Sequence, residues 1–166
     1  MSEKAEHRVC RGVQAWRLVK KSRLETAFDG EGAFRFGGRW NSRGQRMVYA
    51  SSSLALALLE ILVHIDPTQR VPELVAIPIE IPADRIEEEP HSVLKNLAGG
   101  LPWSLSETRR RGDAWLASAN QPALLVPSAV IPLEQNFLLN PAHPDFDRCR
   151  IGEAEALSLD PRLFHA

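Results

Sequence analysis

Cysteine is scarce in this chain. Only Cys10 and Cys149 occur among 166 residues, and neither has a metal-ligand spacing around it. So few cysteines in a chain of this length favour the reducing cytosol. A single disulfide between the two stays open as an alternative.

Long apolar runs and an excess of charge of one sign are also missing. No run reaches transmembrane length, and residues 1–10 are too polar for a signal peptide, so we expect a cytoplasmic protein. Lys and Arg total 20 against 21 acidic residues, for a formal charge of −1. That balance gives no argument for direct DNA binding. The basic run at residues 109–111 is therefore expected to be a solvated helix face.

The common nucleotide and metal motifs are absent as well. The sequence has no internal repeat, P-loop or zinc pattern, and Gly30-Glu31-Gly32 is not the G-x-G-x-x-G of a Rossmann fold. With 44% apolar and 25% charged residues, the composition fits one globular domain over residues 1–166. Residues 1–7 are expected to be a polar extension.

Hydrophobic patterning predicts a chain of mixed strands and helices. Residues 26–38 hold four glycines and three phenylalanines, which predicts an ordered loop. Residues 87–89 are expected to be solvated acidic surface, and residues 91–97 a short helix. The other elements expected are helices at 54–65 and 105–118, and strands near residues 16, 48, 76, 126 and 138 and at 155–159.

Particular residues refine these elements. The run 54–65 is apolar almost all round, so that helix is expected to be buried. A capping box from Ser104 to Glu107 begins the second helix, and Gly112 within it indicates a close neighbour. Pro78 inside a strand predicts an edge or a bulge.

Polar residues at and after a glycine pair are the candidates for chemistry. Arg39 follows Gly37-Gly38 and offers a planar fork for phosphate or carboxylate oxygens. Glu60 is the one carboxylate of the apolar helix, where burial without a partner is costly. A partly exposed position or a structural ion pair would explain it equally well. Tyr49 fits a core strand residue, and Ser128 fits either a turn cap or a hydroxyl projecting into a cleft.

Several motifs together resemble the RES-domain family, named for its arginine, glutamate and serine. The resemblance runs from about residue 16 to 159. Phe36 stands where tyrosine is frequent in the family, so the ring is present without its hydroxyl. The segments that carry the resemblance are Phe28 to Ala33, Gly37 to Asn41, Val48 to Ala50, Ala57 to Glu60 with His64, Gly112 to Trp115, Val126 to Ser128, and Asn136 to Pro144.

The resemblance implies an α+β domain with a split, twisted sheet, similar to the ADP-ribosyltransferase toxins. It implies an NAD⁺-consuming bacterial toxin that acts by hydrolysis or phosphorolysis, without a metal or other cofactor. It also implies a cognate Xre-type helix-turn-helix antitoxin, which would contact DNA in place of this chain. Oligomers of the chain with itself or with the antitoxin stay open. The implied catalytic residues are Arg39, Tyr49, Glu60 and Ser128, and the implied substrate contacts are Phe36, Gly38, Arg39, Asn41, Tyr49 and Ser128.

The residue chemistry agrees with this implication. Breaking the nicotinamide–ribose bond develops cationic oxocarbenium character on the ribose, which a carboxylate such as Glu60 can stabilise. Arg39 is expected to bind the pyrophosphate or the ribose side of NAD⁺, and Tyr49 to stack on or orient the nicotinamide. Ser128 is expected to position the ribose or the incoming nucleophile. ADP-ribosylation of a protein, a non-catalytic nucleotide-binding module and a structural partner of a DNA-binding protein remain as alternatives.

Overall fold

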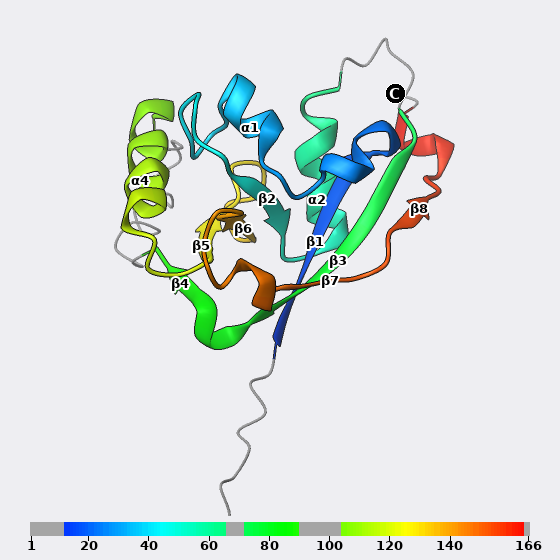
Figure 1. Cartoon of the computed structure of the whole chain (residues 1–166). Coiled ribbons are helices and arrows are strands. Elements are labelled where there is room, and N and C mark those ends of the chain that lie inside the picture. Colours follow the sequence, from blue (N-terminus) through cyan, green and yellow to red (C-terminus); the bar gives the residue numbers. More distant parts are fainter. Residues whose placement is uncertain (1–11, 66–71, 90–103, 165–166) are drawn as a thin grey trace, which may run out of the picture.

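A curled mixed sheet forms the centre of the computed structural model, which describes residues 12–65, 72–89 and 104–164 (Figure 1). The strand order is β4-β5-β6-β2-β1-β3-β7, with β8 paired to β3, and every pair except β4–β5 is antiparallel. The strands are β1 (Gly12–Lys20), β2 (Val48–Ser51), β3 (Leu74–Pro82), β4 (Ile86–Glu88), β5 (Ala123–Pro127), β6 (Gln135–Leu139), β7 (Arg150–Ile151) and β8 (Glu155–Leu157).

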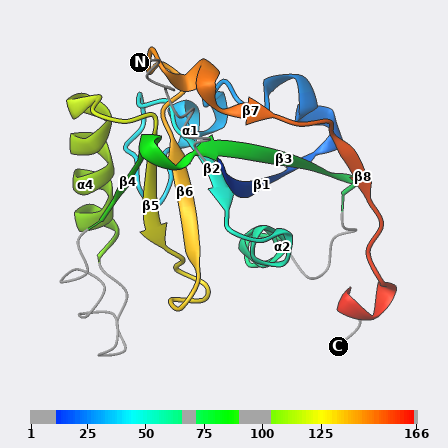
Figure 2. The ribbon, with the colours of Figure 1, turned by 90° about the horizontal axis from the view of Figure 1, so that it is seen from below.

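The sheet has two parts that meet at one register pair, Trp16 of β1 opposite Ser51 of β2. By contrast, β1 and β3 pair along their whole length. Figure 2 shows β5 and β6 running across the direction of β3, as expected for a sheet that twists strongly at a narrow junction. The expected α+β fold with a split, twisted sheet is confirmed.

Three α-helices among the described residues flank this sheet: α1 (Glu31–Phe36), α2 (Leu54–Leu62) and α4 (Leu105–Ser118). The Ser53 hydroxyl accepts a hydrogen bond from the Leu56 amide at 3.1 Å and begins α2. Ser104 begins α4 in the same way, as the capping box predicts. Helix α2 packs on β1 and β3, whereas α4 packs beside β5 (Figures 1 and 2).

Helix α4 lies very close to the segment that follows the glycine pair. A Cβ placed on Gly112 would come within 1.8 Å of the Trp40 carbonyl oxygen, so only glycine permits this approach. The Thr108 hydroxyl donates to the Arg39 carbonyl oxygen at 2.5 Å, and Arg109 Nε donates to that of Gly38 at 2.8 Å. The close neighbour expected at Gly112 is therefore the backbone of the glycine-rich segment.

The proline within β3 lies at a break in the pairing on one side of that strand. Residues 74–76 pair with β8 and residues 79–80 with β7, so Pro78 falls between the two short strands. Its carbonyl oxygen accepts from the Gly152 amide at 2.8 Å. A residue without an N–H is tolerated there because no continuous strand pairs on that side.

Several expectations were wrong. Residues 26–38, expected to be a loop, include the helix α1, which the 3₁₀ turn Lys21–Thr26 precedes. Helix α2 is only partly buried, since Val63 at its end is 58% exposed, because one side of the helix faces away from the sheet. The acidic run includes β4, and Glu89 pairs with Arg111 at 3.2 Å.

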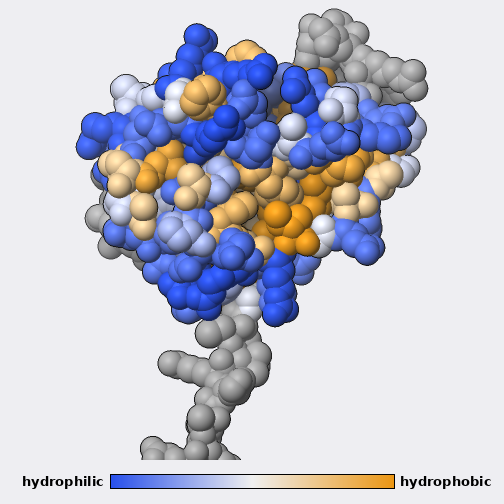
Figure 3. All heavy atoms as spheres, viewed as in Figure 1, coloured by the Kyte–Doolittle hydropathy of each residue, from blue (hydrophilic) through white to orange (hydrophobic). Residues whose placement is uncertain are grey.

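The basic run is thus only partly a solvated face, because Arg109 and Arg111 both have partners while Arg110 is exposed. Other 3₁₀ turns in the described ranges are Ala83–Arg85, Phe146–Arg148 and Pro161–Phe164. The expectations for residues 1–7, for residues 91–97 and for a disulfide to Cys10 lie outside the described residues. Among the helices of the described ranges, none is long and apolar enough to cross a membrane. Figure 3 shows hydrophobic residues across the middle of the face in Figure 1, with hydrophilic residues around them.

Candidate active site

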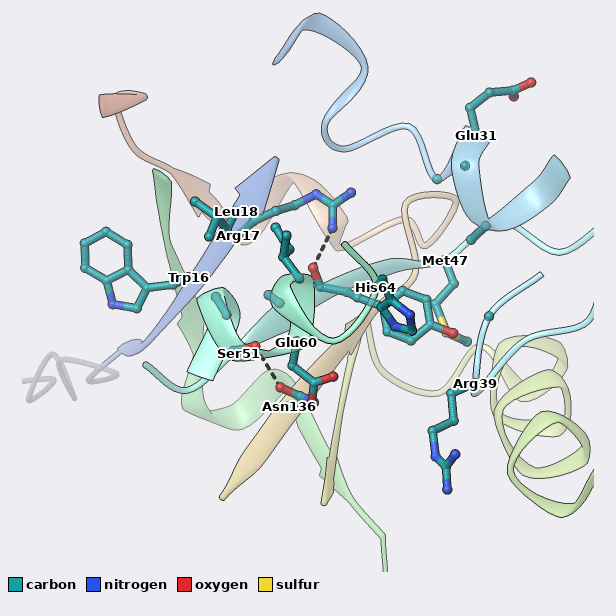
Figure 4. Close-up of a pocket in the computed structure, with 18 of the residues that line it drawn as sticks. Trp16, Arg17, Leu18, Glu31, Arg39, Met47, Ser51, Glu60, His64 and Asn136 are labelled. Carbon is teal, nitrogen blue, oxygen red and sulfur yellow. Dashed lines mark hydrogen bonds between the residues drawn. The ribbon is translucent and has the colours of Figure 1, made fainter. Parts of the chain in front are cut away.

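A cavity of about 350 Å³ lies between the sheet junction, α2 and the glycine-rich segment (Figure 4). Strands β1 and β2 form one wall with Arg17, Tyr49 and Ser51. Glu60 of α2 and His64, which lies just after that helix, line another part. The side opposite carries Gly37, Gly38 and Arg39, and Asn136 of β6 completes the base.

The Glu60 carboxylate is held by two uncharged donors on the same oxygen. Its Oε1 accepts from Ser128 Oγ at 2.7 Å and from Asn136 Nδ2 at 2.5 Å. Asn136 is itself held by Ser51, whose hydroxyl donates to Oδ1 at 2.7 Å. Glu60 is half-buried, and within the ranges that the structure describes it has hydrogen-bond partners and no ion pair. Oε2 has no hydrogen bond within the described part of the chain.

Ser128 caps the turn after β5 and also binds Glu60. Its oxygen accepts from the amides of Val130 and Ile131 at 3.0 and 2.9 Å, which caps the turn that follows. Its own proton goes to Glu60. Ser128 does not line the cavity and is 2% exposed, so it reaches the site through Glu60.

Tyr49 lines the cavity while its hydroxyl is occupied. The hydroxyl donates to Asn41 Oδ1 at 2.7 Å and accepts from the Trp40 amide at 3.0 Å. Burial raises the pKa of the Tyr49 phenol above its ordinary range. With the hydroxyl fixed and neutral, the ring is the part of Tyr49 that is offered to a ligand.

Asn41 and Gly38, two other implied substrate contacts, shape the glycine-rich segment near Tyr49. Asn41 is fully buried, and Nδ2 donates to the carbonyl oxygens of Ala33 and Gln45 at 2.9 and 3.1 Å. Its side chain is not among those that line the cavity, so the geometry gives it a structural role. A Cβ on Gly38 would come within 2.4 Å of the Tyr49 hydroxyl, which explains the glycine there.

Arg39 and Phe36 differ in how they relate to the cavity. Arg39 lines it and is half-buried, and Figure 4 shows its guanidinium extending to the side of the cavity away from Arg17. Phe36 ends α1, is 70% exposed and is not among the lining residues. The structure therefore does not place Phe36, an implied substrate contact, at the cavity.

Arg17 is a second cavity arginine that the sequence reasoning missed. Its Nη1 donates to the Tyr49 carbonyl oxygen at 2.6 Å, and its Nε to that of Ala27. Burial lowers the pKa of Arg17 to about 10, partly offset by Asp29, so the group stays charged at neutral pH. Its position carried a signal: side chains alternate along a strand, and Arg17 shares a face with the buried Ala15 and Val19. Asn136 and Ser51 were likewise missed as partners of Glu60.

A metal site is not evident in this region. Within residues 12–65, 72–89 and 104–164, no three His, Cys, Asp or Glu side chains gather in a way that could hold a metal ion.

The sequence profile of the RES domain matches residues 14–160. The chain belongs to the RES domain family. It is 36% identical to "Toxin Res" of Yersinia enterocolitica over 91% of this chain and 99% of that protein. It is also 36% identical to "Prs ADP-ribosylating toxin" of a Sphingobium species, over 89% of this chain and 94% of the relative.

A solved structure supports the fold of this RES domain. It is described as a crystal structure of the M. tuberculosis MbcT-MbcA toxin-antitoxin complex, and it matches with a TM-score of 0.66 at 18% identity. The match covers 92% of this chain and 87% of the solved chain. At that identity the likeness concerns the fold alone, and it agrees with the two-part sheet described above.

Proposed function

We propose that this RES domain is a toxin that cleaves the nicotinamide–ribose bond of NAD⁺. The observation that carries the proposal is the Glu60 carboxylate. One of its oxygens is held by Ser128 and Asn136, and the other has no such partner among the described residues. A carboxylate held in this way by neutral groups keeps its full negative charge for a cationic ligand. The names of the relatives, which call them toxins, agree with this function.

The proposed step breaks the bond between the ribose carbon and the nicotinamide nitrogen. The bonding electrons return to that nitrogen, and nicotinamide leaves as a neutral molecule. The ribose then carries oxocarbenium character, which Glu60 stabilises. Water completes the reaction by forming ADP-ribose and releasing a proton, or inorganic phosphate by forming ADP-ribose 1″-phosphate. Neither route requires a metal or a redox cofactor.

The other cavity residues suit the remaining parts of NAD⁺. Arg39 offers a planar cation to the pyrophosphate, and Arg17 adds positive charge from the opposite side of the cavity. The ring of Tyr49 offers a flat apolar surface to nicotinamide. A volume of about 350 Å³ is at the small end for ligand cavities, so it accommodates the nicotinamide ribose half while the adenosine half extends outward.

A cognate antitoxin belongs to this proposal, because an unrestrained NAD⁺-cleaving enzyme would harm its own cell. A helix-turn-helix antitoxin of Xre type would supply the DNA binding that a chain of charge −1 lacks. A carboxylate of the partner facing Arg39 would match its fork. The hydrophobic area in Figure 3 provides further surface for such a contact.

ADP-ribosylation of a protein is the second candidate function. The observation in its favour is the relative of 36% identity whose name is "Prs ADP-ribosylating toxin". The bond that breaks is the same, and only the acceptor differs. Both candidates therefore require Glu60 in the same place.

Product analysis separates these functions. Purified protein is incubated with labelled NAD⁺ in three mixtures: buffer alone, buffer with inorganic phosphate, and a cell extract. We expect free nicotinamide in the mixture that contains the acceptor. ADP-ribose indicates hydrolysis, ADP-ribose 1″-phosphate indicates phosphorolysis, and label on a protein indicates transfer. Absence of nicotinamide release in all three mixtures would refute the proposed activity.

A further inference from the structure

Ser51 and Asn136 form a cross-strand pair next to Glu60. They lie directly opposite each other in the register of β2 and β6, and the Ser51 hydroxyl donates to Asn136 Oδ1 at 2.7 Å (Figure 4). Both side chains line the cavity, and Ser51 is otherwise buried. Asn136 is also the first residue of the motif Asn136 to Pro144, to which the resemblance assigned no function for this side chain.

We propose that this pair positions Glu60 for the chemistry, an inference that rests on the proposed function. An asparagine amide has one accepting end and one donating end. Because the Ser51 hydroxyl donates to Oδ1, the donating Nδ2 faces Glu60 Oε1, at 2.5 Å. The reverse orientation would place a carbonyl oxygen against a carboxylate. Ser51 thus determines which end of Asn136 meets Glu60.

The pair aims the carboxylate without neutralising it. Both donors, Asn136 Nδ2 and Ser128 Oγ, bind the same oxygen, so they restrict the rotation of the Glu60 carboxylate and leave Oε2 for a ligand of the cavity that Glu60 lines. An arginine in place of Asn136 would hold the group as well, but it would cancel the charge that stabilises an oxocarbenium ion. A neutral amide avoids this conflict.

The position of the pair in the sheet makes it rigid. Ser51 lies opposite both Asn136 on β6 and Trp16 on β1, at the one register pair that joins the two parts of the sheet. Asn136 also lies opposite Val126 of β5. Groups held on strands keep a carboxylate more precisely in place than groups on loops. The pair thereby fixes the position of Glu60 on α2 relative to the sheet junction.

The decisive variant is Asn136→Asp, which keeps the shape of the side chain. At neutral pH the new carboxylate cannot donate to Glu60 and repels it, so we expect kcat to fall about 100-fold with little change in KM. Below its pKa the new group is protonated and donates again. The ratio of variant to wild-type kcat should therefore rise as the pH falls from about 7.5 to about 5.5.

Matched controls separate positioning from folding. Asn140→Asp changes the same residue type just after β6, where Oδ1 accepts from the Ala142 amide at 3.0 Å and an aspartate can do the same. That variant should keep the wild-type kcat and pH profile. Ser51→Ala should lower kcat about tenfold because the amide loses its fixed orientation, and Ser51→Thr should restore most of it.

Each outcome either supports or refutes the positioning role of Ser51 and Asn136. If the wild type releases no nicotinamide, the proposed function and this inference both fail. If the wild type is active and folded Asn136→Asp keeps its kcat, or its pH profile parallels the wild type, only the positioning role is refuted. If Asn136→Asp does not fold, the comparison of Ser51→Ala with Ser51→Thr is decisive, and equal kcat values in the two would overturn the inference.

Discussion

The Nη1 of Arg17 donates a hydrogen bond of 2.6 Å to the main-chain oxygen of Tyr49. This bond joins β1 to β2, whose register otherwise consists of the pair Trp16–Ser51. A charged side chain thus stabilises the junction of the two parts of the sheet and lines the cavity at the same place. The wall of the candidate active site and the junction of the sheet share this residue.

Replacing Arg17 by lysine should therefore reduce both stability and activity. A lysine keeps the charge but cannot span the carbonyl oxygens of Tyr49 and Ala27 with a planar fork. We expect a loss of about 1–3 kcal/mol in the free energy of unfolding and a rise in KM for NAD⁺. Denaturant unfolding and steady-state kinetics measure the two effects. Arg43→Lys, at an exposed position, is the control. Equal stability of the two variants would contradict the proposed stabilisation of the sheet junction by Arg17.

Gly112 provides a test of the packing of α4. Alanine would put a methyl group within 1.8 Å of the Trp40 carbonyl oxygen, so α4 or the glycine-rich segment must move. The strain of about 1–3 kcal/mol should exceed the helix-propensity gain of at most about 1 kcal/mol. A lower midpoint of thermal unfolding is expected.

Gly32 on α1 is the matched control for that substitution. A Cβ there meets nothing within 4 Å, so Gly32→Ala should leave the midpoint unchanged or raise it slightly. If Gly112→Ala is as stable as Gly32→Ala, the close approach of α4 to Trp40 is not a constraint on the fold.

Tyr49→Phe should separate the ring from the hydroxyl. Removing the hydroxyl leaves buried Asn41 Oδ1 and the Trp40 amide without this partner. We expect a loss of about 1–3 kcal/mol in stability, while kcat stays within about tenfold of the wild type because the ring remains. Tyr49→Ala should lose activity much further. A folded Tyr49→Phe protein as inactive as Tyr49→Ala would show that the hydroxyl itself acts in the reaction.

Regular elements with local signals could be predicted from the sequence, and long-range partners could not. The N-terminus of α4 and the close neighbour of Gly112 follow from capping chemistry and from the absence of a side chain. The six-residue helix α1 escaped prediction because it contains Gly32 and lies between glycines, so its propensity is poor. Asn41, buried beneath it, supplies a distant stabilising contact to Ala33.

The candidate site shows the same division. Glu60 stood out because a carboxylate in an apolar helix requires an explanation. Its partners Ser128 and Asn136 are 68 and 76 residues away, so no local pattern connects them with it. Arg17 could have been found by asking why a charge shares a strand face with buried residues. Phe36 and Asn41 lie close to the motif in sequence but are not among the residues that line the cavity.

The proposed antitoxin leads to a prediction in cells. Expression of this chain alone should arrest growth and lower the NAD⁺ content, since the enzyme would act without restraint. Co-expression with the neighbouring regulator should restore both, and the complex, rather than the chain by itself, should bind operator DNA. Growth curves, NAD⁺ assays and gel-shift experiments provide the measurements. Specific operator binding by the isolated chain, or an antitoxin that binds without reducing NAD⁺ turnover, would contradict this model of control.

NAD⁺ turnover by purified wild-type protein, compared with Glu60→Gln, tests the central claim most directly. Glutamine retains an oxygen that can accept from Ser128 and Asn136, so the fold should persist while the negative charge is lost. The exposed Glu153→Gln is the control for removal of one carboxylate. We predict nicotinamide release by the wild type and by Glu153→Gln, and a fall in kcat of about 100-fold or more in folded Glu60→Gln. Equal rates of nicotinamide release by folded Glu60→Gln and the wild type would contradict the account.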